Sequence, residues 1–506
     1  MYQTTVSYPC AGKREDREYT CMRKFVPLLL LIPLLLINVP NAHDWGDDFA
    51  QYLIQARNML EAKAQTDNGL VFDTSSGQFA VQAYPVGFPL VLAPVFAFAG
   101  YEIRPFLILE SLFLIGLGLL LVRYYKRFFS EFASILLVLI LVYNPFLLEQ
   151  KGQILSEFPF TFWLVLLILL LDQNKTSIKH FLILGLVVCL MISTRIIGVV
   201  ALPALLLHYF FLKKNDVDSK LKFRLKSSLI VIAFSILFFL FLNSLLFPVP
   251  LGNFFGFYKG AGESHPFMIQ EAFLLYLKQL NLLFMFPESR AMLLNDLLGI
   301  FILIGWFRAL IKQKNFSEWF FLFYIVVLLL YPYLNGGYRM LIPVVPLMAR
   351  YIFETLQALL SLTKIKQYRI ALILFLGMFL YQPFTMLYAT VKTGTIIPEG
   401  PQTPEAKEMI HFVREKTPEN AVIVFLKARA MSFYTQRHTT YRLELLSEQA
   451  NDSMFQRIHV THLVKCIDPN NSELNNSSFE SYYMANADRY TEIWRNRVFA
   501  VYERKH

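Results

Sequence analysis

The chain has 506 residues, of which 56% are hydrophobic and only 17% are charged, and its mean hydropathy is +0.45. This composition excludes an ordinary soluble domain, in which about a quarter of the residues are charged. The net charge of +10 does not indicate a nucleic-acid partner, because the Lys and Arg residues are spread over short loops between apolar runs. The composition therefore indicates a membrane protein.

The N-terminal segment carries basic residues between positions 13 and 24, directly before its first apolar run. This pattern fits an uncleaved membrane anchor, which we favour. It also fits a signal peptide with a cleavage site at Ala42.

Apolar runs recur along the chain until about residue 391. A transmembrane helix needs roughly 20 apolar residues, and about 17 suffice when flanking side chains reach the interface. We therefore expect a polytopic α-helical membrane protein with about eleven transmembrane helices. They are predicted at 25–39, 106–122, 132–148, 158–171, 181–193, 196–212, 227–247, 293–311, 319–334, 341–362 and 370–391.

The segment PVGFPLVLAPVFAFAG, residues 85–100, is apolar but short and contains three prolines. If it does not cross the membrane, every basic loop lies on the same side as the basic N-terminus, as the positive-inside rule requires. We therefore predict a juxtamembrane helix that lies in the interface or dips partway into the bilayer, and a cytoplasmic N-terminus. The basic loops are 123–127, 174–179, 213–226, 308–314 and 363–369.

With this topology the first outer loop, at 40–84, and the C-terminal tail lie outside the cytoplasm. We expect a transmembrane domain over 1–391 and a soluble extracytoplasmic domain over 392–506. The tail has the patterning of a small α/β domain. An amphipathic helix, a buried strand and a pair of short strands about a turn are predicted at 403–417, 421–426 and 492–503.

Three carboxylates, Asp44, Asp47 and Asp48, stand within five positions just after the first apolar run. One of them is explained as a helix cap, but three are not. Crowded carboxylates at a lipid boundary raise one another's proton affinity, which favours a general base. Glu157, at the start of a later apolar run, adds a second acid on the same predicted face.

Cations on this outer face are few. Taken singly, each is best explained by contact with lipid phosphates, but as a group they suit an anionic headgroup. They are Arg195, Lys259, Arg290 and Arg339. Tyrosines on the same face belong to the aromatic belt or, alternatively, contact a sugar ring. They are Tyr84, Tyr101, Tyr258 and Tyr338.

The order of these features resembles that of the membrane-embedded GT-C glycosyltransferases, specifically the bacterial relatives of protein O-mannosyltransferase and of the aminoarabinose transferase that modifies lipid A. Four segments carry the resemblance: DDFAQYLIQARNML at 47–60, YPVGFPL from Tyr84, LSEFPFTFW around Glu157, and YRMLIP from Tyr338. Glu157 stands where many relatives have Asp. Tyr84 stands where the lipid A enzymes have Lys, so their particular donor sugar is not implied.

The resemblance implies transfer of a sugar, with inversion, from a polyprenyl-phosphate donor to an acceptor hydroxyl at the outer face of the bacterial inner membrane. The acceptor is a lipid, a glycan or a protein. An alcohol needs a base to take its proton, and a loop carboxylate is available. Arg339 and Arg195 are the candidates for holding the departing phosphate. Tyr52, Tyr84 and Tyr338 are the candidate substrate contacts.

The choice of base between Asp47 and Asp48 stays open. The acidic pair itself favours the first, and the spacing to Tyr52 favours the second, to which we lean. His43 beside Asp44 is weak evidence for a metal site, because no second ligand is near in sequence. We therefore expect no obligatory metal or other cofactor, with a divalent cation as the alternative.

Three other classes of protein are alternatives to a transferase. A ligase or polymerase of lipid-linked glycans shares the donor and the outer face. A transporter of lipid-linked or small anionic substrates is expected to carry ionisable residues within several spans, whereas the charges here collect at one surface. A receptor or scaffold leaves the carboxylates unused.

Overall fold

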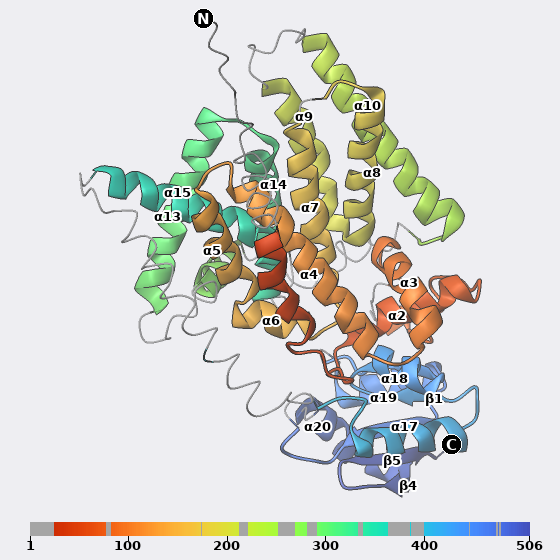
Figure 1. Cartoon of the computed structure of the whole chain (residues 1–506). Helices are drawn as coiled ribbons and strands as arrows, with labels where there is room; N and C mark the ends of the chain where they lie inside the picture. The colour runs from red at the N-terminus through yellow and green to blue at the C-terminus, as the bar shows by residue number, and fades with distance from the viewer. Residues whose placement is uncertain are drawn as a thin grey trace, which may run out of the picture.

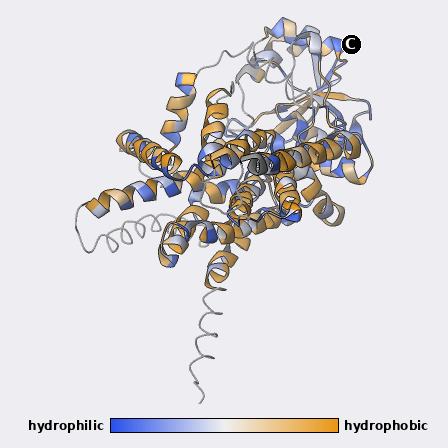
Figure 2. Ribbon diagram, turned by 90° about the horizontal axis from the view of Figure 1, so that it is seen from above, coloured by the Kyte–Doolittle hydropathy of each residue, from blue (hydrophilic) through white to orange (hydrophobic). Residues whose placement is uncertain are grey.

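The computed structural model describes residues 25–76, 82–173, 175–211, 221–250, 269–280, 291–331, 337–362, 385, 399–444, 446–471, 474 and 477–505. Residues up to 362 are mostly helical, and those from 399 onward form a sheet flanked by helices at one end of the helical part (Figure 1). Hydrophobic residues predominate on the helices, whereas the C-terminal part is mixed (Figure 2).

Helices occupy every predicted span that falls within the described residues; the predicted span 370–391 lies outside them apart from Thr385. The first helix is Phe25–Leu35 and ends in η1 (Ile32–Leu35). The others are α2 (Asp47–Leu60), η2 (Thr74–Ser76), α3 (Gly87–Ala99), α4 (Arg104–Tyr125), α5 (Glu131–Val142), α6 (Pro145–Lys151), α7 (Glu157–Leu171), α8 (Ile178–Thr194), η3 (Ile196–Val200), α9 (Ala201–Phe211), α10 (Leu221–Leu240), η4 (Phe241–Leu246), α12 (Ile269–Lys278), α13 (Ala291–Lys312), α14 (Phe316–Leu329), η7 (Gly337–Val344) and α15 (Val345–Leu362).

Two described helices are long and apolar enough to cross a membrane, Arg104–Tyr125 and Leu225–Leu246, and a third span arises if α5 and α6 count as one. The first has 61% of its apolar window buried inside the protein and is central. The second has only 22% buried, so most of this window lies at the surface of the helical part. The total of eleven spans stays a prediction, since the other apolar helices are shorter.

The predicted span at 132–148 is occupied by two helices, α5 and α6, which are bent by 58° at their junction. Asn144 caps α6: its side-chain oxygen accepts hydrogen bonds from the backbone N–H groups of Phe146 and Leu147. Pro145 follows at the first helical position, where it fits best and where it disfavours helix at the preceding residue. The Asn-Pro pair therefore ends one helix and starts another.

The juxtamembrane segment 85–100 forms α3, which has 13 residues and contains Pro94. A helix of this length rises about 20 Å, which is less than the roughly 30 Å of a bilayer core. Its first residue is Gly87, where a Cβ atom would stand 2.6 Å from the backbone carbon of Ser193 in α8. Glycine thus permits the close contact of α3 with α8.

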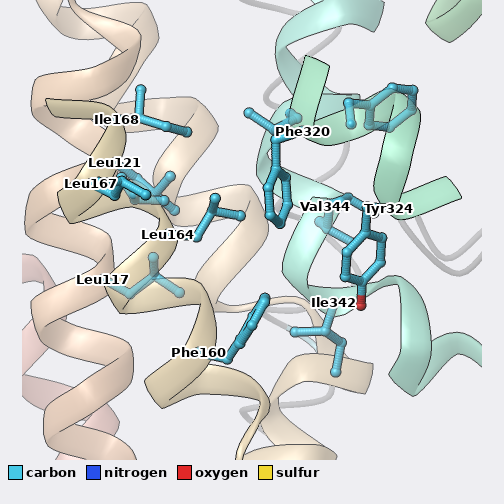
Figure 3. Packing of buried hydrophobic residues seen from close by; sticks show 14 of the residues in the cluster. Leu117, Leu121, Phe160, Leu164, Leu167, Ile168, Phe320, Tyr324, Ile342 and Val344 are labelled. Atoms are coloured by element: carbon cyan, nitrogen blue, oxygen red, sulfur yellow. The ribbon is translucent and has the colours of Figure 1, made fainter. Parts of the chain in front are cut away.

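The helical part is held together by one large apolar cluster. Figure 3 shows side chains of α4 and α7 meeting side chains of α14 and η7 within it. Phe160 of α7 and Tyr324 of α14 are among them, and Tyr324 also donates a hydrogen bond to the carbonyl oxygen of Met340. This packing fixes α7 and η7 side by side. It thereby brings Glu157, the first residue of α7, close to Arg339 in η7.

The C-terminal part confirms the elements predicted in the tail. The predicted amphipathic helix is α17, capped by the Thr403 hydroxyl, the buried strand is β1, and the last pair is β4 and β5. The sheet order is β2-β1-β3-β5-β4, with β1 parallel to β2 and β3, and with β5 antiparallel to β3 and β4. The elements are α17 (Pro404–Lys416), β1 (Val422–Val424), α18 (Ala428–Thr435), β2 (His438–Thr440), α19 (Glu448–Arg457), β3 (His462–Cys466), α20 (Ser477–Ala485), η8 (Ala487–Arg489), β4 (Tyr490–Arg495) and β5 (Phe499–Arg504).

The first outer loop and the C-terminal part are packed together as one body. Leu70 pairs in parallel with Thr439 at the β2 edge of the sheet. The Trp45 ring, fully buried, contacts the rings of Phe425 and Phe499. One apolar cluster includes residues of α2, α3 and the sheet. The loop that carries the acidic pair is therefore positioned by the C-terminal part as well as by the helices.

Candidate active site

The acidic pair forms the first turn of α2, which begins after Gly46. Neighbouring residues of a helix are turned by about 100° from one another, so the two carboxylates point in different directions. Asp47 Oδ1 accepts a hydrogen bond from the backbone N–H of Ala430 at 3.4 Å. Asp48 instead faces the helical part, where its Oδ2 accepts from Arg339 Nη1 at 2.7 Å.

Glu157 begins α7 and is almost fully buried. Its Oε1 lies 2.5 Å from Arg195 Nη1 and also accepts a hydrogen bond from Arg339 Nε. Arg339 therefore joins Asp48 and Glu157, two acids that lie 109 positions apart, through two edges of one guanidinium group.

Two tyrosines of the outer loop complete this network. The Tyr84 hydroxyl donates to Asp48 Oδ1 at 2.6 Å, and its ring lies 5.0 Å from that of Tyr52. The Tyr52 hydroxyl is hydrogen-bonded to Ser156 Oγ, which also accepts from Arg195 Nη1 at 3.1 Å. Burial raises the pKa of Tyr84 well above its ordinary value and that of Tyr52 to about 12. Both hydroxyls therefore keep their protons at physiological pH.

The two neighbouring aspartates differ in proton affinity. For Asp48, burial alone would raise the pKa, but Arg339, the Tyr84 hydroxyl and Arg429 outweigh it and lower the pKa below its ordinary value. For Asp47, burial prevails over the opposing effect of Arg429 and Lys427, and the pKa is raised. Asp48 is thus held as a carboxylate, and Asp47 takes up a proton more readily.

Arg429 is a site residue that the sequence did not reveal. It is the second residue of α18, and its Nη1 donates to the Tyr84 hydroxyl at 3.2 Å and lies 4.0 Å from Asp48 Oδ1. Its guanidinium carbon stands 5.5 Å from the centre of the Tyr84 ring. The available signal was weak: Lys427 and Arg429 follow the buried strand in FLKARAM, but no pattern shows where that segment docks.

The structure brings Asp48, Glu157, Arg195, Arg339, Tyr52 and Tyr84 into one network. The other predicted acid and the other candidate substrate contact lie outside it. Asp47 is adjacent but faces α18, and Tyr338 packs its ring on Phe146, with a buried hydroxyl that has no hydrogen-bond partner among the described residues. Lys259, Arg290 and Tyr258 fall outside the part of the chain that the structure describes.

Among the described residues, the candidate metal ligands are paired with other groups of the protein. His43 uses both ring nitrogens within the protein: Nε2 accepts from the Ile154 N–H, and Nδ1 faces Asp44. The carboxylates of Asp48 and Glu157 are paired with guanidinium groups. Over the residues described, no group of three or more His, Cys, Asp or Glu side chains is close enough to bind a metal ion.

The scan against protein-family models and the search of curated proteins both gave no match. Among solved structures, the chain is similar to ArnT from Cupriavidus metallidurans bound to undecaprenyl phosphate, at 12% identity and a TM-score of 0.55, over 96% of this chain and 98% of that chain. It is also similar to the archaeal oligosaccharyltransferase AglB from Archaeoglobus fulgidus in complex with an inhibitory peptide and a dolichol-phosphate, at 14% identity and a TM-score of 0.51, over 88% and 70%.

A further structure of the Archaeoglobus fulgidus oligosaccharyltransferase, in complex with Zn and sulfate, matches at 13% identity and a TM-score of 0.53, over 88% of this chain and 68% of that chain. These neighbours are GT-C glycosyltransferases. The fold is therefore the GT-C fold of membrane glycosyltransferases, as the order of the sequence motifs predicted. At these identities the likeness concerns the fold, and the chemistry of this chain must be argued from its own residues.

Proposed function

We propose that this protein transfers a sugar from a polyprenyl-phosphate donor to an acceptor hydroxyl at the outer face of the membrane, with inversion. The observation that carries the proposal is the network in which Arg339 joins Asp48 to Glu157. It sets carboxylates and guanidinium groups side by side where the outer loop meets α7 and η7, which is the combination that such a transfer requires. ArnT is a neighbour in fold that binds undecaprenyl phosphate, and this supports the choice of donor class.

In the proposed reaction, an acceptor hydroxyl oxygen attacks the anomeric carbon of the donor sugar. The bond between that carbon and the phosphate oxygen breaks, its electrons stay on the phosphate, and the hydroxyl proton passes to a carboxylate. Arg339 and Arg195 balance the charge that develops on the leaving phosphate. Arg339 has five N–H donors, and its Nη2 makes no hydrogen bond to a described residue, so the two N–H bonds of Nη2 can point to the phosphate.

We propose Asp48 as the base, although its pKa is lowered in the protein alone. The charges responsible are those of Arg339 and Arg429. A donor phosphate beside these guanidinium groups offsets their field, and a nearby negative charge raises the proton affinity of a carboxylate. Donor binding would therefore turn Asp48 into a stronger base. Asp47, with its raised pKa, is the alternative.

The proposed orientation places residues 392–506 and the first outer loop outside the cytoplasm of a bacterial inner membrane. Cysteine accessibility at Gly100 tests it, since this residue directly follows α3 and a Cβ atom there would have no other atom within 4 Å. Labelling of Gly100→Cys by an impermeant reagent from the outer side is the expected result. Protection from outside with labelling from inside would mean that residues 85–100 cross the membrane or that the orientation is reversed, and either result contradicts the proposed topology.

The function is tested by mass spectrometry of cell-envelope glycoconjugates with and without the gene. The expected result is an acceptor that loses a fixed sugar mass when the protein is absent. A loss of long glycans alone, with single sugars still attached, would indicate a ligase or polymerase. Accumulation of sugar inside vesicles that contain the purified protein, without transfer, would indicate a transporter.

A further inference from the structure

Arg429 reaches from the C-terminal part into the network formed by the outer loop and the helices. Its side chain is only 12% exposed, and it contacts both Tyr84 and Asp48. It is held in place from two sides, by the face of the Tyr84 ring and by the docking of α18 on α2, where Ala430 N–H binds Asp47. The position of its guanidinium group is thus set by the fold.

The charge balance of the network depends on this residue. The outer loop and the helices supply two carboxylates to the network, Asp48 and Glu157, and two guanidinium groups, Arg195 and Arg339, so that these four charges cancel. Arg429, from the C-terminal part, adds a positive charge, which gives the network an attraction for a phosphate. Lys427, from the same segment, acts electrostatically on the neighbouring Asp47. At low exposure such charges interact strongly, because little water screens them.

Resting on the function proposed above, we infer that Arg429 binds the phosphate of the lipid-linked donor, so that the C-terminal part forms one wall of the donor site. A guanidinium group suits this role because its planar fork matches two phosphate oxygens. Tyr84, beneath it, supplies the ring on which it rests. The C-terminal part is then required for donor binding itself, and not only for recognition of an acceptor.

The alternative is that Arg429 merely docks the C-terminal part on the outer loop. Arg457 provides a matched control, because its guanidinium also joins the C-terminal part to the outer loop, through Asp73 Oδ2 at 2.7 Å. Asp73 makes no contact with the network around Asp48 among the described residues. Arg429→Gln and Arg457→Gln therefore remove the same charge from the same pair of segments, but only the first touches the network.

The experiment measures binding of undecaprenyl phosphate, and of undecaprenol as the uncharged probe, to the purified full-length protein by native mass spectrometry. The wild type is expected to prefer the phosphate. Arg429→Gln should weaken phosphate binding at least tenfold and leave undecaprenol binding unchanged, whereas Arg457→Gln should behave as the wild type.

A second variant tests charge rather than shape. A lysine at position 84 extends about as far as the tyrosine it replaces, so its ammonium group reaches the region between Asp48 and Arg429. In the double variant Tyr84→Lys/Arg429→Gln, the outer loop supplies the positive charge that the C-terminal part has lost. The affinity for undecaprenyl phosphate should then recover by at least half of the loss, measured on a logarithmic scale. Melting temperatures of all variants verify folding.

Equal phosphate binding by the wild type and Arg429→Gln would overturn the inference. So would an equal loss in Arg429→Gln and Arg457→Gln, because both would then act through docking. If the wild type itself shows no preference for the phosphate over undecaprenol, the donor class in the proposed function is wrong, and the inference falls with it.

Discussion

Arg339 Nη1 donates to Asp48 Oδ2 at 2.7 Å, although the two residues lie 291 positions apart in the chain. This contact joins the first outer loop to η7, and through Glu157 the same guanidinium group also reaches α7. The three segments are separated by several apolar helices, so the contact is made only when the bundle has closed around them. The network is thus a product of the whole fold.

Arg339→Lys is expected to lower sugar transfer by two to three orders of magnitude. Lysine keeps the charge, but one ammonium group cannot serve Asp48 and Glu157 from two edges while it holds a phosphate. Loss of a charge-stabilising donor costs about 10²–10³ in kcat. Initial rates with a lipid-linked donor measure the effect. Arg127→Lys is the control, because Arg127 pairs with Asp172 away from the network; equal losses in both variants would remove Arg339 from the mechanism.

Asp48→Asn should reduce transfer by about 10²–10⁴, the range for loss of a general base, and Asp47→Asn should reduce it far less. The pH profile separates the two candidates. A base must be deprotonated, so activity falls as the pH drops through its pKa. In kcat/KM, which reports the enzyme without donor, Asp48 has a lowered pKa and gives no acid limb above its ordinary pKa of 3.8. If Asp47 is the base, its raised pKa places the acid limb of the pH profile above the ordinary aspartate pKa of 3.8. Full activity of both single variants would leave the reaction without an aspartate base.

Tyr84→Phe is expected to shift the acid limb of kcat/KM to higher pH. The hydroxyl donates to Asp48 at 2.6 Å and stabilises the carboxylate, so its removal raises the pKa of Asp48 toward the ordinary value. Tyr52→Phe is the matched control, since the Tyr52 hydroxyl is bonded to Ser156 and not to Asp48. A shift of the same size in both variants would show that the hydrogen bond to Asp48 is not its cause.

Much of this arrangement was predictable because it follows from local patterns. Apolar runs mark helices whatever their partners, and Thr403 caps α17 through a hydrogen bond three residues away. The order of the acidic and Arg motifs along alternating spans also placed Asp48, Glu157 and Arg339 on one face. These residues were predicted to share a surface, and the structure adds that they share hydrogen bonds.

The features that were missed depend on contacts between distant segments. Arg429 enters the network because Trp45 and Phe425 pack together, and no local pattern encodes that docking. Tyr338 stays a predicted substrate contact from a motif, and the structure places its ring against Phe146, where it is buried. The bend at Asn144 is marked in the sequence by the Asn-Pro pair. Because the residues on both sides of this pair are apolar, they were assigned to one span.

Gly400→Ala should loosen the C-terminal part from the outer loop. A Cβ atom at this position would stand 1.8 Å from the carbonyl oxygen of His43, so one of the two segments must move. Overpacking of this kind costs about 1–3 kcal/mol. Hydrogen–deuterium exchange of α2 and α18 should rise together and transfer should fall. Glu399→Ala, at an exposed neighbouring position, should leave both unchanged. Unaltered exchange in Gly400→Ala would contradict this docking.

Arg350→Met should destabilise the protein by about 3–5 kcal/mol, since it leaves a buried carboxylate without its cation. Arg350 Nη1 donates to Glu318 Oε1 at 2.8 Å, both side chains are almost fully buried, and the guanidinium carbon lies 3.8 Å from the centre of the Phe128 ring. Adding Glu318→Gln to Arg350→Met removes the uncompensated negative charge. The double variant should therefore recover much of the stability that Arg350→Met loses. Unfolding in detergent, followed over all four members of this cycle, measures the coupling between the two residues. Additive losses would mean that Arg350 stabilises the bundle through its ring contact rather than through the ion pair.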